Sequence, residues 1–311
     1  ETVRFVLSEN WEIEARCEIE EKSITHISRI STPGGSLQQR FTVTEVLPGT
    51  YLYGCTEKPV KTPADLKIAV AYEPGMDADY PSLAKAKIQR LKQKIGNDGI
   101  VSTWTPHGPF NIASLLVPEE ELYSLFLLEP EFYRDLMEFC IIRTKDYTSA
   151  LSAAGVDAHS IGANVAGGFI GKKSFDEHIL PFEKKYMDIV QSGGVPAIYH
   201  NCGEIMNLLE SYIQVGPKII EPFSPPPIGD GDIGKAKQIL EGKAVIIGNL
   251  DQVNVLKPGP ADKIKEITEK TVLQGKQGGR FIFQTADFIE YDTPPEHITA
   301  MVDAARTNGS M

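Results

Sequence analysis

From residue 99 onward, short apolar runs alternate with longer amphipathic stretches. The short runs are typical of buried strands, and the longer stretches repeat their apolar residues with the period of a helix. The predicted strands cover 99–104, 156–161, 195–199, 217–220, 244–247 and 280–283. The predicted helices cover 118–128, 130–153, 174–191, 204–213, 233–240, 260–274 and 294–306. Strands that alternate with helices and form no hairpins pair in parallel.

The first 58 residues follow a different pattern, in which apolar and polar residues largely alternate. This is the period of half-exposed antiparallel strands. We therefore predict two domains: an antiparallel β subdomain over 1–58 and a (β/α)₈ barrel of the TIM type over 59–311, an α/β fold with an N-terminal β appendage. Because only six barrel strands are visible, one or two more are expected within 51–72 or before residue 1.

A doubly wound sheet is the alternative to a barrel. That fold carries a glycine-rich nucleotide-binding turn directly after its first strand. The only similar stretch, 229–234, follows a run of prolines and stands in the wrong place. The barrel is therefore favoured.

Composition narrows the class of protein. The chain has 311 residues, 41% of them hydrophobic, and a net charge of −11, which argues against nucleic acid or an anionic membrane as a partner. Its cysteines, at 17, 55, 140 and 202, show no paired spacing, and no apolar run approaches the roughly 20 residues of a membrane span. We expect a soluble cytoplasmic protein, and a homodimer is left open.

Every predicted strand ends in polar or ionisable residues. In a parallel barrel these ends face one mouth, where active sites are built. Each such residue could instead cap the following helix. The residues are Thr105 and His107, Asn164, His200 and Cys202, Glu221, Asn249 and Asp251, and Gln284, Thr285 and Asp287. We predict a polar pocket lined by His107, His200, Cys202, Glu221 and Asp287.

His200 and Cys202 lie two residues apart at the end of an apolar strand. Side chains at this spacing on an extended segment point the same way, so an imidazole and a thiol could share one metal ion, with zinc the best match. The alternative is a half-buried histidine beside an inert cysteine.

Several motifs together resemble the uroporphyrinogen decarboxylase superfamily, in its corrinoid-dependent methyltransferase branch. His200-Asn-Cys-Gly203 matches the H-x-C-G of that branch, and Gly248-Asn-Leu-Asp-Gln252 followed by Leu256-Lys-Pro-Gly resembles a turn of the superfamily. The segments 278–285 and 292–302 are similar to its closing strand and final helix, and 174–182 to the helix before the H-x-C-G strand. The resemblance covers roughly residues 97–306.

Two departures qualify what the resemblance implies. Zinc-binding relatives that methylate coenzyme M carry a second cysteine after the last barrel strand, where this chain has Thr285-Ala-Asp287. The arginine-bearing N-terminal motif of the decarboxylase is absent, which argues against a substrate with several carboxylates. The segment 221–230 resembles that of relatives that demethylate methoxylated aromatics.

The resemblance implies methyl transfer from a small methylated substrate, such as a methoxylated aromatic, to the cobalt of a corrinoid protein. The reverse use, methyl transfer from a corrinoid to a thiol, is the alternative, as are a decarboxylase-like lyase and a silent binding protein. The assigned residues are His200, Glu221 and His107 for catalysis, Asn164, Trp104 and Asn249 for substrate binding, and His200, Cys202, Glu221 and Asp287 for zinc. His107 would be the proton donor if no metal is present.

Overall fold

The computed structural model describes residues 2–309, so the outermost positions of the two predicted domains, 1 and 310–311, lie outside the described residues. The described chain divides into two compact units. One holds the residues up to Tyr80 together with Ile112–Asp146, and the other holds Pro81–Asn111 and the residues from Tyr147 onward. The predicted domain boundary after residue 58 stays a prediction.

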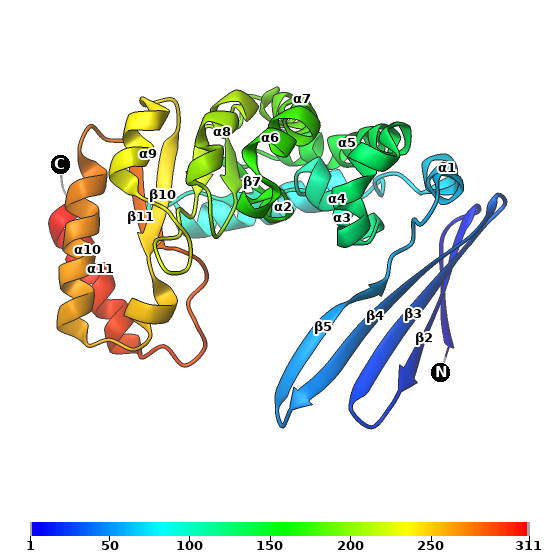
Figure 1. Ribbon diagram of the computed structural model, residues 1–311, viewed down its shortest axis with the longest axis horizontal. Helices are drawn as coiled ribbons and strands as arrows, with labels where there is room; N and C mark the ends of the chain where they lie inside the picture. Colours follow the sequence, from blue (N-terminus) through cyan, green and yellow to red (C-terminus); the bar gives the residue numbers. More distant parts are fainter. Residues whose placement is uncertain (1, 310–311) are drawn as a thin grey trace. The chain divides into compact units, whose positions relative to one another are not determined.

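An antiparallel sheet occupies the start of the chain (Figure 1), as the alternating pattern predicted. Its strands follow one another in the order β1-β2-β3-β4-β5. Their bounds are β1 Thr2–Ser8, β2 Trp11–Ile19, β3 Ser23–Thr32, β4 Gly35–Leu47 and β5 Thr50–Glu57. Alternation places every second side chain on the same face of such a sheet, so the sheet has an apolar and a polar face.

Helix α1 (Pro63–Tyr72) packs on one end of the apolar face. Trp11 and Leu37 from the sheet form a buried cluster with Ala69 from the helix. The helix starts where it does because Thr62 and Asp65 form a capping box, with Pro63 in the first turn.

The expectation of further barrel strands within 51–72 is wrong. Residues Thr50–Glu57 pair antiparallel with β4, and Pro63–Tyr72 is helical. The short connection at Pro48-Gly49 lets the segment fold back on β4 as a hairpin, and the capping box then commits the next segment to a helix.

A six-stranded parallel sheet forms the second unit, in the order β11-β10-β9-β8-β7-β6. Every neighbouring pair is parallel, which confirms the predicted βαβ units. Within residues 2–309, β6 and β11 are edge strands, so six of eight expected strands are found and closure stays a prediction. The strands are β6 Ser102–Trp104, β7 Ala158–Gly162, β8 Ala197–His200, β9 Ile219–Glu221, β10 Val245–Leu250 and β11 Phe281–Thr285.

From α4 onward the helices agree with the predicted ones, with shifts at their ends. Predicted helix 204–213 starts later, because a 3₁₀ turn precedes it and Asp230 accepts hydrogen bonds from the amides of Ile205 and Met206. A further helix, α3, was not predicted. The bounds are α2 Tyr80–Ile95, α3 Pro109–Leu116, α4 Glu119–Leu128, α5 Pro130–Ala153, α6 Lys172–Ser174, α7 Leu180–Gln191, α8 Leu209–Val215, α9 Ile233–Leu240, α10 Ala261–Lys276 and α11 Pro295–Gly309. Among the described residues, no helix is both long enough and apolar enough to cross a membrane.

Candidate metal centre

His200 and Glu221 end two neighbouring strands in register. The pairing of β8 with β9 sets the two residues side by side, so their side chains leave the sheet together. His200 Nδ1 lies 3.1 Å from Glu221 Oε1, and each side chain is 13% exposed. Gln284 on β11 donates to the other oxygen, Glu221 Oε2, at 3.4 Å. The strand register therefore builds an oriented imidazole at the carboxyl edge of the sheet.

Cys202 and Asp287 complete a cluster with His200. One ligand atom from each of these half-buried residues lies within 4.8 Å of the others. Zinc takes nitrogen, sulfur and oxygen ligands, which in a tetrahedral site are about 3.3–3.8 Å apart. The set fits one ion after a small contraction and leaves a fourth position for a substrate. Glu221 holds Nδ1 of His200, which leaves Nε2 for the metal and fixes the tautomer.

The electrostatics of this cluster suit a cation. Burial acts to lower the pKa of His200, but hydrogen bonds to Cys202 and Glu221, and their negative charges, outweigh it and raise that pKa to about 9. Without a metal the imidazole is therefore protonated at neutral pH. The side chains that face it are arranged to stabilise positive charge at this position.

Trp104, the last residue of β6, and His107, three residues later, lie beside His200. The Trp104 ring is 5.3 Å from the His200 ring in an edge arrangement and 6.0 Å from the His107 ring. Trp104 is 59% exposed, so its remaining surface is open to a ligand. A side chain at Gly162 would collide with the His107 ring, so the glycine makes room for it. Burial, and then the charge of His200, lower the pKa of His107, which keeps it neutral at pH 7.

Three other strand-end residues form hydrogen bonds that hold the main chain near the site. Asn164 Oδ1 accepts from the Cys202 amide at 3.3 Å and so holds the turn that carries Cys202. Asn249 is buried and donates to the carbonyl of Gly231 at 3.3 Å. Asp251 accepts from the amides of Val253 and Asn254, both at 2.8 Å, which is the capping role considered for such residues.

Comparison with known proteins places this chain in a family. The uroporphyrinogen decarboxylase (URO-D) model matches residues 54–308. The chain belongs to this family.

The curated relatives in the family differ in activity. Methylcobamide:CoM methyltransferase MtbA of Methanosarcina acetivorans is 28% identical over 64% of this chain and 56% of its own. A uroporphyrinogen decarboxylase of Geotalea uraniireducens is 24% identical over 79% of this chain and 70% of its own. The chain thus spans little more than half the length of the first of these relatives.

One solved structure supports the fold directly. A methyltransferase from Methanosarcina mazei superposes with a TM-score of 0.68 over 83% of this chain and 73% of its own, at 21% identity. A likeness at this identity shows that the two chains share a fold.

A buried network behind the turn that carries Cys202 was missed by sequence reasoning. Asn201, between the two candidate ligands, is fully buried and donates to the Tyr212 hydroxyl at 2.6 Å. The Tyr212 ring packs at 5.0 Å on Tyr199, whose hydroxyl donates to Glu183 at 3.1 Å. The sequence pattern could have indicated this network, because the charged Glu183 lies on the apolar face of α7 with Tyr186, Met187 and Val190.

Glu183 should make stability depend on pH. Its burial raises the pKa of this carboxyl from 4.5 to about 7, against the hydrogen bonds from the Phe110 amide and the Tyr199 hydroxyl. Between these values the folded state binds more protons than the unfolded state, so stability falls as pH rises toward 7 and stays lower above it. We expect Glu183→Gln to be stabilising at pH 8, by at most about 3 kcal/mol, and nearly neutral at pH 4.5.

Thermal unfolding at both pH values would measure this effect. Glu266→Gln is the matched control, because Glu266 is an exposed helical glutamate whose removal should leave the pH dependence unchanged. An identical pH dependence in wild type and Glu183→Gln would show that the pKa of this carboxyl is the same in the folded and the unfolded chain, and would contradict the prediction.

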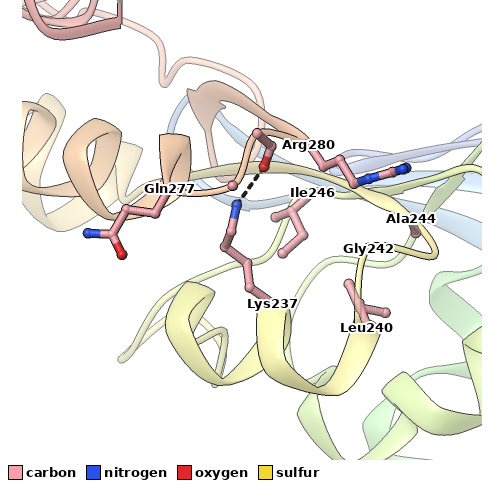
Figure 2. Close-up of a pocket in the computed structure, with 9 residues that line it drawn as sticks. Lys237, Leu240, Gly242, Ala244, Ile246, Gln277 and Arg280 are labelled. Atoms are coloured by element: carbon pink, nitrogen blue, oxygen red, sulfur yellow. Dashed lines mark hydrogen bonds between the residues drawn. The ribbon is translucent and has the colours of Figure 1, made fainter. Parts of the chain in front are cut away.

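A separate cavity of about 230 Å³ lies at the opposite, amino-terminal end of β10 and β11. Lys237 and Arg280 are among its lining residues (Figure 2). Lys237 Nζ donates to the carbonyls of Gly275 and Gly279, both at 2.6 Å, and so ties the end of α10 to α9. The ammonium group thus serves the fold there.

Proposed function

We propose that the chain transfers a methyl group from a small methylated substrate, of the methoxylated aromatic class, to the cobalt of a corrinoid carried by a partner protein. The observation that carries the proposal is the cluster of His200, Cys202 and Asp287 at the carboxyl edge of the parallel sheet, with Glu221 orienting the imidazole. Family membership and the methyltransferases among the relatives support it.

The bond changes follow from simple displacement at carbon. The electron pair of reduced cobalt forms the new cobalt–carbon bond, and the carbon–oxygen pair leaves with the phenolate oxygen. A phenolate is a poor leaving group unless its developing charge is stabilised. Bound zinc would supply a Lewis acid at that oxygen. His200, Cys202 and Asp287 would hold the ion, and the single thiolate leaves it more electrophilic than two would.

The other residues of the site would position the substrate. The exposed face of Trp104 can stack on an aromatic ring next to His200. His107 is neutral at pH 7, so it would act through a ring N–H that donates a hydrogen bond to the leaving oxygen. Asn164 would act on the reaction by holding the Cys202 turn, and Asn249 by holding the segment at Gly231.

We further propose that the six parallel strands belong to a closed (β/α)₈ barrel. The family and the superposition on the methyltransferase structure support this. Within residues 2–309 the parallel sheet has six strands, so two of the expected eight are not found in this part of the chain.

Methyl transfer from a corrinoid to a thiol is the second candidate. The methylcobamide:CoM methyltransferases among the relatives favour it. In that direction the cluster would hold an acceptor thiol as its thiolate, which is the attacking form. The presence of Asp287 where those enzymes carry a second cysteine speaks for the ether substrate.

A methyl-transfer assay with a panel of substrates tests the proposal. The purified, zinc-supplemented chain would be mixed with a reduced corrinoid protein and with methoxylated aromatics, methylamines or methylated thiols. We expect methyl-cobalt absorption to appear with the methoxylated aromatics and to require the chain. A second reaction would start from methyl-cobalt on the corrinoid protein and a thiol. Consumption of that methyl-cobalt, together with none formed from any substrate of the panel, would establish the second candidate instead.

A further inference from the structure

The antiparallel sheet exposes an apolar surface that its own helix does not cover. Strand pairing sets Ile19, Ile24, Val43 and Tyr53 in one row across four strands. The adjacent row is Cys17, His26, Phe41 and Cys55. Ile19 is 76% exposed and Tyr53 is 77% exposed, and the Phe41 and Tyr53 rings lie 6.2 Å apart. We call these two rows the apolar rows.

The helix-covered part of this face lies at the other end. Trp11, Ile13, Ile30 and Leu37 share the face with the apolar rows and pack against α1. On the edge strand β1, Val3 and Phe5 share this face and are about half exposed. The sheet therefore has one covered end and one end that meets water.

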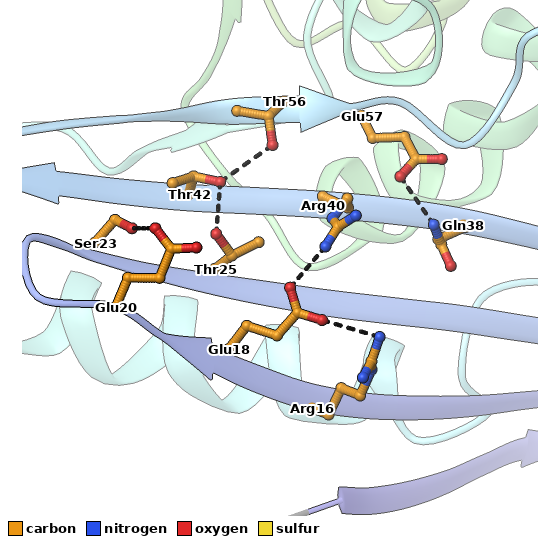
Figure 3. Close-up of polar contacts among 10 residues, drawn as sticks. All are labelled: Arg16, Glu18, Glu20, Ser23, Thr25, Gln38, Arg40, Thr42, Thr56 and Glu57. Carbon is orange, nitrogen blue, oxygen red and sulfur yellow. Dashed lines mark hydrogen bonds and ion pairs between the residues drawn. The ribbon is translucent and has the colours of Figure 1, made fainter.

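The opposite face of the sheet is built for water. Glu18 pairs with Arg16 at 3.0 Å and with Arg40 at 2.7 Å (Figure 3). Hydroxyls of Thr25, Thr42 and Thr56 form a chain of hydrogen bonds across three strands. Charged groups of this face thus form ion pairs with one another, while neither apolar row contains Asp, Glu, Lys or Arg. One face therefore suits contact with water, and the other suits packing against apolar side chains.

We propose that the apolar rows form the interface between two copies of this chain, packed face to face as a sandwich of two sheets. Two antiparallel sheets pack face to face about 10 Å apart with interleaved side chains. A two-fold axis places the same surface on both partners, so an uncharged surface can complement itself.

Area and charge favour a second copy as the occupant. The exposed apolar side chains of this face present roughly 600–700 Å², near the ~800 Å² per partner of a standard interface. Neither apolar row holds a formally charged side chain, so two copies can meet there without setting like charges against one another, despite a net charge of −11 each. The family match begins at residue 54, so most of the sheet lies outside the matched region. The apolar rows belong to the first compact unit and His200, Cys202 and Asp287 to the second.

Sedimentation velocity from low micromolar to about 100 µM tests the proposal. We expect the wild-type chain to reach twice the monomer mass of 34.2 kDa. Tyr53→Glu should raise the dimer dissociation constant by roughly 100-fold or more, because symmetry buries two unpaired carboxylates at once. Leu52→Glu is the matched control. Leu52 is 63% exposed on the same strand but points to the polar face, so its change should move the constant less than about threefold.

Ile19→Glu provides a second disruptive variant in case Tyr53→Glu does not fold, and circular dichroism would verify the sheet in both. A wild-type monomer at about 100 µM overturns the proposal. So does a dimer that both substitutions leave intact. A monomer that binds a corrinoid protein through this surface, and loses that binding in Tyr53→Glu, would assign the surface to a different partner and also overturn it.

Discussion

His200→Ala is expected to lower kcat/KM for methyl transfer by roughly 1,000-fold or more, because it removes both a metal ligand and the group that Glu221 orients. Stabilisation of charge at the leaving oxygen exists only in the transition state, so kcat should fall far more than substrate affinity. The fold should survive, because His200 is the last residue of its strand, at the carboxyl end. Single-turnover methyl transfer, with thermal unfolding of the same samples, measures both effects.

Two further variants sharpen that experiment. Glu221→Gln keeps a hydrogen-bond acceptor for His200 Nδ1 but loses the negative charge, so we expect an intermediate loss of about 10–100-fold. His26→Ala is the control, since this histidine lies in the antiparallel sheet, outside the cluster. Full activity in a folded His200→Ala variant would exclude the proposed mechanism.

Zinc should bind with a stoichiometry of one ion per chain, and Cys202→Ser should weaken that binding by roughly 100-fold or more, because a thiolate is lost from the ligand set. Calorimetric titration of the metal-free chain measures the affinity without any assay of activity. Since the pKa of His200 lies near 9, zinc displaces a proton at pH 7, and the apparent affinity should rise with pH up to about 9.

Cys55→Ser is the matched control for the zinc titration. Cys55 is a half-buried thiol that donates to the Glu57 carbonyl in the antiparallel sheet. Cobalt substitution adds a spectroscopic check, because a thiolate ligand gives a charge-transfer band that should vanish in Cys202→Ser alone. Equal zinc affinity in the two serine variants would remove Cys202 from the ligand set.

The parts of the site that could be predicted from sequence lie at strand ends. The apolar run that ends in His200 predicts a buried strand, and parallel pairing brings the end of the next strand beside His200. Local pattern and topology together therefore suffice to associate His200 with Glu221. The same reasoning reaches Asp287, because it follows the last strand by two residues.

Other features depend on contacts between segments distant in sequence. Asn201 appears as an ordinary turn residue until Tyr212, on the following helix, approaches its amide. Residues 51–57 carry an apolar content that suits a barrel strand as well as a hairpin strand, and the pairing with β4 decides between them. The absence of a Cβ at Gly162 acquires meaning only when the His107 ring lies over it.

The register between β8 and β9 also bears on how such a site can evolve. The closeness of His200 and Glu221 comes from main-chain pairing of their own strands, so the connecting segment through α8 can gain or lose residues without separating them. A one-residue slip within β9 would instead turn Glu221 to the other face. Lineages that keep this pairing are free to remodel the surrounding loops, and with them the substrates that reach the same pair of side chains.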